Sequence, residues 1–236
     1  MEQIGIDSII LAGGRGKRLR RVIKDLPKPL AQIGDKPFLD ILLDILDKCP
    51  LIKRVVLAVS YRSEMIISRY KDNTYSFKID FSIEKDPLGT GGAVKKALSL
   101  TTTSDIIVLN GDTFTEINYQ KLIDAHRTRN SKATIVLHKS DDTIRYGCVE
   151  IDSNLKIIGF KEKAEIVGPG YINAGIYVFQ KSLFDVIPQE KVLSLETDII
   201  PYFIKGDAYA YITEGKFIDI GIPESYFRAI DYLRGI

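Results

Sequence analysis

The chain has 236 residues, of which 45% are hydrophobic and 27% charged, values that are ordinary for a globular protein with a substantial core. Its 33 basic and 31 acidic residues leave a net charge of +2, so we expect no global field that attracts nucleic acid or an anionic membrane. Two cysteines, Cys49 and Cys148, are too few for a disulfide framework and favour a reducing compartment, the cytoplasm. We expect neither a signal peptide nor a membrane-spanning segment.

The chain opens with a short apolar run, residues 8–11, that breaks into glycines and cations. This pattern predicts a buried strand feeding a loop whose backbone can approach a ligand closely. Four cations make the loop electropositive: Arg15, Lys17, Arg18 and Arg20. The loop is therefore expected to wrap a polyphosphate, with a solvated basic turn as the alternative. Just beyond it, Pro27 and Pro29 are expected to hold Lys28 in an extended segment.

Strands and helices are predicted to alternate over the next eighty residues. Apolar periodicity indicates helices over 38–49, 63–70 and 91–100, and strands over 53–60, 78–83 and 105–109. The last of these helices is opened by a second glycine-rich loop, residues 88–92. Such alternation favours an α/β fold, a Rossmann-like domain with a mixed, mostly parallel sheet covered by helices on both faces.

In the second half of the chain the regular alternation of strands and helices gives way to shorter elements that include a hairpin. We expect a helix over 118–129, a strand over 133–137, a hairpin over 147–160 that turns at 152–154, and a strand over 171–179. Helical stretches follow near 195–203 and 223–233. The hairpin and its neighbours predict a small β-rich lid on the same sheet, so that residues 1–236 form a single domain.

Two aspartates are placed where a ligand would meet the sheet. Asp112 directly follows the apolar strand 105–109, and in open α/β sheets ligands bind beyond the carboxyl ends of the strands. The alternative is a helix cap or a turn residue. Asp219 lies within a short apolar strand, where a charge is costly unless it is paired or bound to a cation.

The opening loop matches neither of the familiar nucleotide motifs. A dinucleotide fingerprint built on Gly14 and Gly16 requires a glycine at position 19, which is Leu19. A P-loop ending at Gly16 requires a glycine at position 11, which is Leu11, and a Ser or Thr at position 18, which is Arg18.

The combination of motifs resembles the sugar-1-phosphate nucleotidyltransferases. Their opening signature, Leu-Ala-Gly-Gly-x-Gly-x-Arg-Leu followed by Pro-Lys-Pro-Leu, stands here at residues 11–19 and 27–30. Further motifs of that family recur in order at 88–92, 110–112, 146–147, 162–163, 173–175 and 219–221. Within it, residues 22–39 and 83–92 are most similar to the guanylyltransferases that act on D-glycero-α-D-manno-heptose 1-phosphate. Three residues depart from the common pattern: Lys17, Phe217 and Ile222.

The resemblance implies condensation of GTP with a sugar 1-phosphate, a heptose phosphate first, releasing pyrophosphate, with Mg²⁺ as cofactor. It divides the chain into a nucleotide-binding half, about 1–140, and a sugar-phosphate-binding half, about 141–236. It implies catalytic roles for Arg15, Lys28, Asp112 and Asp219, the two aspartates holding the metal. The implied nucleotide-binding residues are Leu11, Ala12, Gly13, Gly14, Arg15, Glu84, Gly89, Thr90 and Gly111. The implied sugar-phosphate-binding residues are Gly147, Glu162, Lys163 and Asn173.

Glu84 extends the prediction to the base. It ends the strand 78–83 at a position that, in the family, lies beside the nucleobase. A carboxylate only accepts hydrogen bonds, and guanine offers two N–H donors on one edge, so Glu84 favours GTP over UTP or dTTP. The alternative is an exposed strand-end charge.

Other readings of the whole chain stay open. Mannose-1-phosphate guanylyltransferase and a uridylyltransferase are the alternatives within the enzyme class, and a non-catalytic sugar-nucleotide-binding regulator is the alternative outside it. The presence of all five charged residues of the motifs favours an enzyme: Arg15, Lys28, Asp112, Lys163 and Asp219. The sequence leaves a homodimer open.

Overall fold

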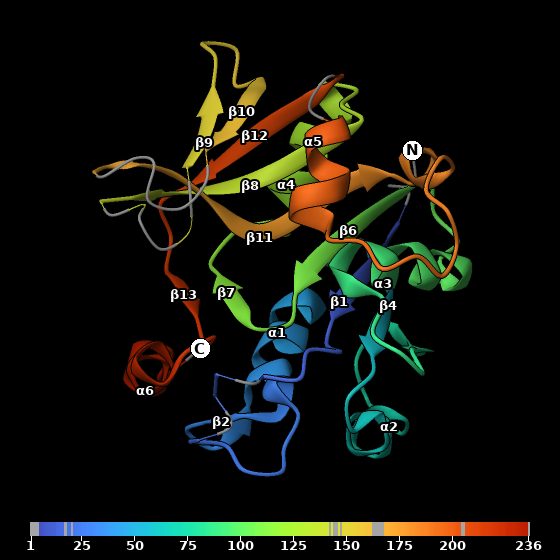
Figure 1. Ribbon diagram of the computed structural model, residues 1–236, viewed down its shortest axis with the longest axis vertical. Helices are drawn as coiled ribbons and strands as arrows, with labels where there is room; N and C mark the ends of the chain where they lie inside the picture. Colours follow the sequence, from blue (N-terminus) through green and yellow to red (C-terminus); the bar gives the residue numbers. More distant parts are fainter. Residues whose placement is uncertain are drawn as a thin grey trace.

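The fold is built on one large sheet. The computed structural model describes residues 5–16, 18–19, 21–141, 143, 146, 148–161, 168–203 and 206–235. Its seven-stranded sheet has the order β12-β8-β11-β6-β1-β4-β5 (Figure 1). In chain order these strands are β1 (Ile6–Leu11), β4 (Ile52–Val59), β5 (Lys78–Ile83), β6 (Asp105–Asn110), β8 (Ala133–Ser140), β11 (Gly170–Gln180) and β12 (Ala208–Thr213).

The sheet is mostly parallel, as predicted. β1 pairs in parallel with β4 and β6, β4 with β5, and β8 with β12. Only β11 runs the other way among the seven, because it pairs antiparallel with both β6 and β8. The central strands are apolar on both faces, with Ile9, Ile10 and Val56 fully buried, which suits parallel strands covered by helices on either side.

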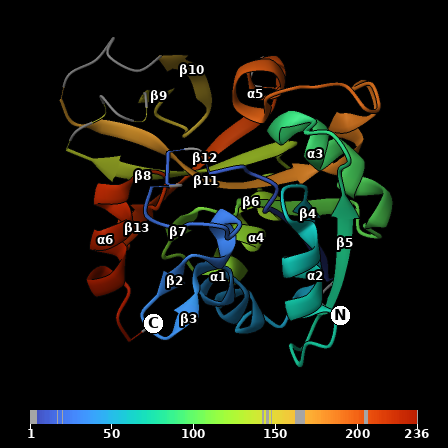
Figure 2. The ribbon, with the colours of Figure 1, turned by 60° about the horizontal axis from the view of Figure 1, so that its bottom comes forward.

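Helices cover both faces of the sheet and divide the core in two. One hydrophobic cluster packs α1 (Phe38–Asp47), α2 (Ser63–Tyr70), α4 (Tyr119–Thr128) and α6 (Pro223–Tyr232) against the sheet. The other packs α3 (Gly89–Ala97) and α5 (Ile200–Phe203) against the opposite face. Figure 2 shows α3 and α5 above the sheet and α1 and α4 below it. In the described part of the chain, no helix combines the length and the apolar character needed to cross a bilayer.

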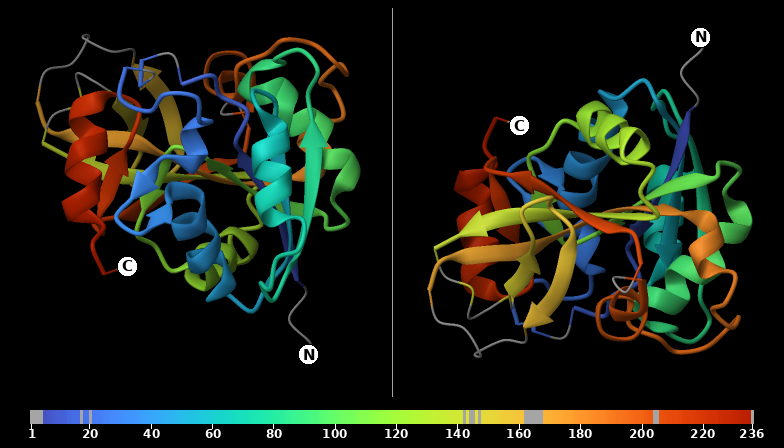
Figure 3. Two further views of the ribbon diagram at one scale, coloured as in Figure 1. Left: turned by 90° about the horizontal axis from the view of Figure 1, so that it is seen from below. Right: turned by 90° about the horizontal axis from the view of Figure 1, so that it is seen from above.

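The predicted hairpin is present as β9 (Cys148–Ile151) and β10 (Ile157–Lys161), which form a two-stranded sheet of their own. It meets the large sheet at a bridge between Lys156 and Tyr209, and Ala210 N donates to Leu155 O at 2.8 Å. In Figures 1 and 3 this yellow hairpin stands beside β12. The hairpin of the expected lid thus lies adjacent to the large sheet. Its neighbours β8, β11 and β12 are not part of a separate lid, because they are strands of the large sheet itself.

Several short elements differ from the prediction. The prediction missed β12, the pair β2 (Gln32–Ile33) with β3 (Lys36–Pro37), and β7 (Thr113–Thr115). The short strand expected around Asp219 is present as β13 (Phe217–Asp219), which pairs with β7. The last pair joins segments about a hundred residues apart, so three-residue strands form there through partners that local patterning does not reveal. Near residue 195 the chain forms a π-helix, Leu195–Ile199, that runs into α5.

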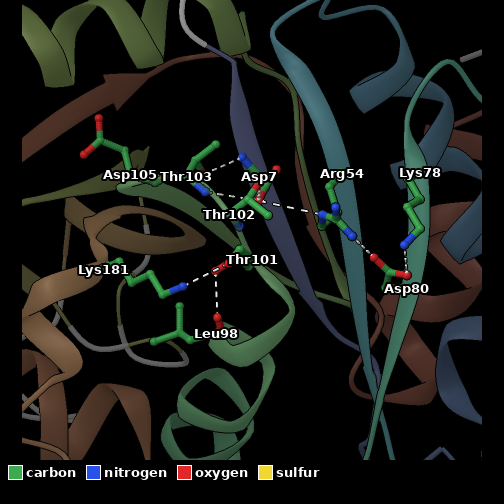
Figure 4. A network of polar contacts seen from close by, with 10 residues as sticks. All are labelled: Asp7, Arg54, Lys78, Asp80, Leu98, Thr101, Thr102, Thr103, Asp105 and Lys181. Atoms are coloured by element: carbon green, nitrogen blue, oxygen red, sulfur yellow. Dashed lines mark hydrogen bonds and ion pairs between the residues drawn. The ribbon is translucent and has the colours of Figure 1, made fainter.

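Polar contacts close the amino-terminal edge of the sheet (Figure 4). Asp7, at the start of β1, is 1% exposed and accepts hydrogen bonds from Thr102 N at 2.5 Å and Thr102 Oγ1 at 3.0 Å. On its other side Arg54 pairs with Asp80, which also binds Lys78 Nζ at 2.8 Å. These charged side chains pair with groups of the protein itself. The cavity of the candidate site lies at the opposite, carboxyl-terminal edge of the sheet.

Candidate active site

A cavity of about 300 Å³ lies at the carboxyl ends of the parallel strands. It sits at the point where β1 has β6 on one side and β4 on the other, the switch point at which open α/β sheets bind ligands. Most of the predicted nucleotide-side residues line it: Leu11, Gly13, Gly14, Arg15, Lys28, Glu84, Gly89, Thr90, Gly111 and Asp112. Among the described predicted residues, Ala12, Asn173 and Asp219 lie outside the lining.

The loop after β1 is held close to its neighbours. Ala12 is a core residue, 1% exposed, and its N–H donates to Ala58 O at 2.8 Å. Gly111 N donates to Leu11 O at 3.1 Å, and a Cβ on Gly111 would lie 2.5 Å from that same oxygen. Position 111 therefore requires glycine for close backbone packing. Arg15, by contrast, has an exposed side chain.

The backbone at Lys28 corrects the prediction. Lys28 begins a short 3-10 helix, Lys28–Leu30, instead of lying in an extended segment; only Pro27 before it is extended. Leu30 N donates to Pro27 O at 2.9 Å and Ala31 N to Lys28 O at 3.0 Å, which forms the turn. Pro29 lies in the first turn of this helix, where no backbone hydrogen bond requires its missing N–H. A residue that precedes proline disfavours helical backbone angles, but at Lys28 the hydrogen bonds of the turn outweigh that preference.

Lys28 and Asp112, both on the cavity lining, form an ion pair. Lys28 Nζ lies 2.5 Å from Asp112 Oδ2, and the two side chains are 8% and 39% exposed. Asp112 Oδ1 also accepts a hydrogen bond from Thr113 Oγ1 at 3.2 Å. A nearly buried ammonium and a half-exposed carboxylate thus share one position that faces the cavity. Asp112 lies in the turn between β6 and β7, as the alternative has it, and its carboxylate pairs with Lys28 from there.

Asp219 comes beside Asp112 through the β7–β13 pair. Asp219 lies opposite Thr113, and Ile220 N donates to Asp112 O at 2.9 Å. Asp219 Oδ1 accepts from Gly221 N at 2.5 Å. Among the described residues no cluster of three or more His, Cys, Asp or Glu side chains is present. Two carboxylates carried on adjacent backbone segments are hard-oxygen donors of the kind that hold Mg²⁺, which is usually bound by one or two carboxylates together with substrate phosphates.

Glu84 faces the cavity from the end of β5 and is 6% exposed, so it is not an exposed strand-end charge. Its Oε2 accepts from Leu88 N at 2.9 Å. Burial raises the pKa of the carboxyl, while the Leu88 hydrogen bond and the charge of Lys96 pull that pKa the other way. One carboxylate oxygen is thereby fixed by the loop.

The glycines of the second loop serve packing against another chain segment. Helix α3 begins at Gly89, two residues earlier than predicted. Gly91 N donates to Leu193 O at 2.8 Å, and Leu193 N to Leu88 O at 2.9 Å. A Cβ on Gly92 would lie 2.4 Å from Lys191 O. These contacts bring residues 191–199, which we call the 191–199 segment, against the start of α3.

Replacing Gly92 with alanine is expected to lower the free energy of unfolding by about 1–3 kcal/mol, because the backbone at Lys191 and the side chain of Leu88 must move to admit the methyl group. Urea unfolding measures the change. Gly14→Ala is the matched control, since nothing lies within 4 Å of the Cβ that it would add. Equal stability of the two variants would contradict the packing role of Gly92.

The structure also shows a residue that the sequence did not suggest, Glu196. Its Oε2 accepts from Thr90 Oγ1 at 2.9 Å and its Oε1 from Tyr177 O–H at 3.3 Å. Asn173 Nδ2 donates to the Tyr177 oxygen at 2.8 Å. The predicted residues Thr90 and Asn173 are therefore joined through Glu196, a carboxylate that no recognised motif marks. The predicted residues Gly147, Glu162 and Lys163, and Lys17, lie outside the described residues.

Residues 7–234 match the nucleotidyl transferase family. The chain belongs to that family. A nucleotidyl transferase from Campylobacter jejuni, D-glycero-alpha-D-manno-heptose 1-phosphate guanylyltransferase, is 43% identical over 94% of this chain and 97% of its own. The protein of the same description from Aneurinibacillus thermoaerophilus is 38% identical over 95% of this chain and 96% of its own. Mannose-1-phosphate guanylyltransferase from Mycobacterium tuberculosis is more distant, at 32% identity over 98% of this chain and 66% of its own.

The solved structure of HddC from Yersinia pseudotuberculosis complexed with GMP-PN has a TM-score of 0.85 and 41% identity to this nucleotidyl transferase. The alignment covers 97% of this chain and all of that one, 100%. The family and the mostly parallel sheet agree with the prediction from sequence.

Proposed function

We propose that this nucleotidyl transferase condenses GTP with D-glycero-α-D-manno-heptose 1-phosphate to give the GDP-heptose and pyrophosphate, in the cytoplasm and for surface polysaccharide synthesis. The observation that carries the proposal is the cavity at the β1 switch point, where Arg15, Lys28, Glu84 and Asp112 converge. Full-length similarity to two heptose 1-phosphate guanylyltransferases supports the choice of sugar.

The chemistry requires that two polyanions meet. An oxygen of the sugar phosphate attacks the α-phosphorus of GTP, a new P–O bond forms, and the bond to the bridging oxygen of pyrophosphate breaks. Such a transfer depends on positioning and on neutralising charge, with no covalent nucleophile. Arg15, exposed and on the cavity lining, would bind the triphosphate, and Lys28 would stabilise charge that develops near the α-phosphate.

The chain's own residues would also hold a divalent cation. Asp112 and Asp219 would bind Mg²⁺, which when bound neutralises phosphate charge. In the structure Lys28 pairs with Asp112, so this ammonium balances the carboxylate and is already beside the place where the phosphates would lie. The same lysine can then turn from Asp112 to a phosphate oxygen without leaving the cavity.

The other half of the site would hold the sugar phosphate. Lys163 would receive its phosphate, Glu162 and Asn173 would bind its hydroxyl groups, and Gly147 would allow close backbone approach. The nucleotide-binding half, about 1–140, and the sugar-phosphate-binding half, about 141–236, would meet across β6 and β11, which pair in the sheet.

A substrate panel tests the proposal. GTP, UTP, dTTP and ATP are each combined with the 1-phosphates of the manno-heptose, mannose and glucose, and the sugar nucleotide is identified by mass spectrometry. The highest kcat/KM is expected for GTP with the heptose phosphate. A higher value for mannose 1-phosphate would assign the protein to the mannose enzymes instead, and turnover of no pair would favour a non-catalytic binding protein.

Glu84→Gln is expected to lower the preference for GTP over UTP about tenfold to a hundredfold, because glutamine cannot accept from both guanine N–H groups while keeping its bond to Leu88 N. The ratio of kcat/KM values for GTP and UTP measures this. An unchanged ratio would contradict base recognition by Glu84.

Stability against pH supplies the control for that variant. Because burial raises the pKa of Glu84, folding favours its protonated form. The stability that this form provides is complete below the pKa of the unfolded chain and is lost as pH rises through the raised pKa of the folded state. Glu84→Gln should therefore be at least as stable as the wild type at pH 8 in thermal melts, so that lost selectivity is not lost folding.

A further inference from the structure

Glu196 lies between the two proposed subsites. It is half-buried in the π-helix Leu195–Ile199, on the 191–199 segment. One of its carboxylate oxygens, Oε2, accepts from Thr90, in the first turn of α3 and on the cavity lining, and also from Ser194 Oγ of its own segment at 3.3 Å. The other accepts from Tyr177, on β11. A single side chain thus contacts both the nucleotide-side loop and the strand that carries Asn173.

The hydrogen bonds around Glu196 have a fixed direction. The Thr90 hydroxyl oxygen accepts from Leu195 N at 2.7 Å, so its own hydrogen is free to point to Glu196. The Tyr177 oxygen likewise accepts from Asn173 Nδ2 at 2.8 Å, and its hydrogen points to Glu196. Both hydroxyls therefore need an acceptor, and a carboxylate is the side chain that accepts at two oxygens.

The surroundings keep these groups in place. Tyr177 is 0% exposed, and burial raises the pKa of its hydroxyl well above the usual value, so the phenol stays a donor. Asn173 is oriented by Gly175 N, which donates to Asn173 Oδ1 at 3.0 Å. The 191–199 segment is fastened to the start of α3 by the backbone bonds of Leu193 with Leu88 and Gly91. These contacts restrict the motion of the side chains that connect Thr90 to Asn173.

We infer that Glu196 is a positioning residue that fixes the nucleotide-side loop relative to β11 and so aligns the sugar phosphate with the α-phosphate of GTP. This role rests on the proposed function. It adds to that function a residue outside the cavity lining, Glu196, that sets the distance between the two bound substrates. Glutamine at position 196 has one carbonyl oxygen, so either the Tyr177 hydroxyl or the Thr90 and Ser194 hydroxyls would lose their acceptor.

The test compares Glu196→Gln with a carboxylate-to-amide change in the same segment. Asp198 is exposed and absent from the cavity lining, and its Oδ2 accepts from Ser194 N at 2.7 Å, so Asp198→Asn is the matched control. Glu196→Gln is expected to lower kcat about tenfold to a hundredfold, the scale of a small misalignment of reacting groups. Its GTP dissociation constant, measured by calorimetry without sugar phosphate, should stay close to the wild-type value.

Tyr177→Phe and the double variant complete the test. Tyr177→Phe should share the kinetic defect, and Glu196→Gln with Tyr177→Phe should be no slower than Glu196→Gln alone, because the two residues act as one unit. A merely structural role predicts something else: a fall in thermal stability and in active fraction, with kcat per active site unchanged. That result, or equal behaviour of Glu196→Gln and Asp198→Asn, would overturn the inference.

A readout without turnover separates this inference from the proposed function. If the wild type turns over no substrate pair, the proposed function is wrong. The positioning role of Glu196 is then tested by the hydrogen exchange of residues 88–92 and 191–195 on addition of GTP. Protection of both segments in the wild type and in Asp198→Asn, but of 88–92 alone in Glu196→Gln, supports the positioning role. The same protection pattern in all three proteins contradicts it.

Discussion

Asp112→Asn is expected to lower kcat about a hundredfold to a thousandfold, the usual effect of removing a group that stabilises charge in the transition state. The carboxylate lies on the cavity and beside Asp219, and an amide in its place would weaken binding of a divalent cation and leave Lys28 without its anion. Steady-state kinetics at saturating GTP, sugar phosphate and Mg²⁺ measures the effect.

Two further proteins make that result specific. Asp219→Asn should show a loss of similar size, because the two carboxylates are proposed to hold one metal ion. Asp86→Asn is the control: Asp86 is exposed on the loop after β5 and is absent from the cavity lining. Since Lys28 is 8% exposed, Asp112→Asn is also expected to lose stability, and the melting temperature must be read beside kcat. Wild-type turnover by folded Asp112→Asn would contradict the proposed metal site.

Arg15→Ala is expected to cost about a hundredfold in kcat/KM for GTP while leaving the melting temperature unchanged. Arg15 is exposed and lines the cavity, so its removal takes away phosphate binding without opening the core. Arg15→Lys should recover part of the loss, because lysine restores the charge but not the paired N–H groups of a guanidinium. Kinetics with GTP varied at fixed sugar phosphate measure both variants. If Arg15→Ala keeps its wild-type kcat/KM, the loop after β1 does not bind the triphosphate.

Much of the cavity lining could be predicted from sequence because its parts are local. The apolar run 8–11, the glycines after it and Asp112 directly after β6 each follow from the rule that loops at the carboxyl edge of a parallel sheet meet the ligand. Ten of the predicted residues line the cavity at this edge: Leu11, Gly13, Gly14, Arg15, Lys28, Glu84, Gly89, Thr90, Gly111 and Asp112.

Most of what the sequence did not predict depends on long-range contacts, and Lys28 is the local exception. The backbone at Lys28 forms a turn because of its own hydrogen bonds, against the local bias of the prolines. The glycines at 91 and 92 are explained by Leu193 and Lys191, a hundred residues away, and Glu196 acquires its partners only when α3, β11 and the 191–199 segment come together. No periodicity or spacing in one segment carries that information.

Pyrophosphate release from GTP, with and without D-glycero-α-D-manno-heptose 1-phosphate and in the presence of Mg²⁺, tests the proposed nucleotidyl transfer most directly. The wild type should release pyrophosphate in step with formation of the GDP-heptose and only when the sugar phosphate is present, and folded Asp112→Asn should release almost none. Release that does not depend on the sugar phosphate, or no release with any triphosphate and sugar phosphate, would contradict the proposed reaction.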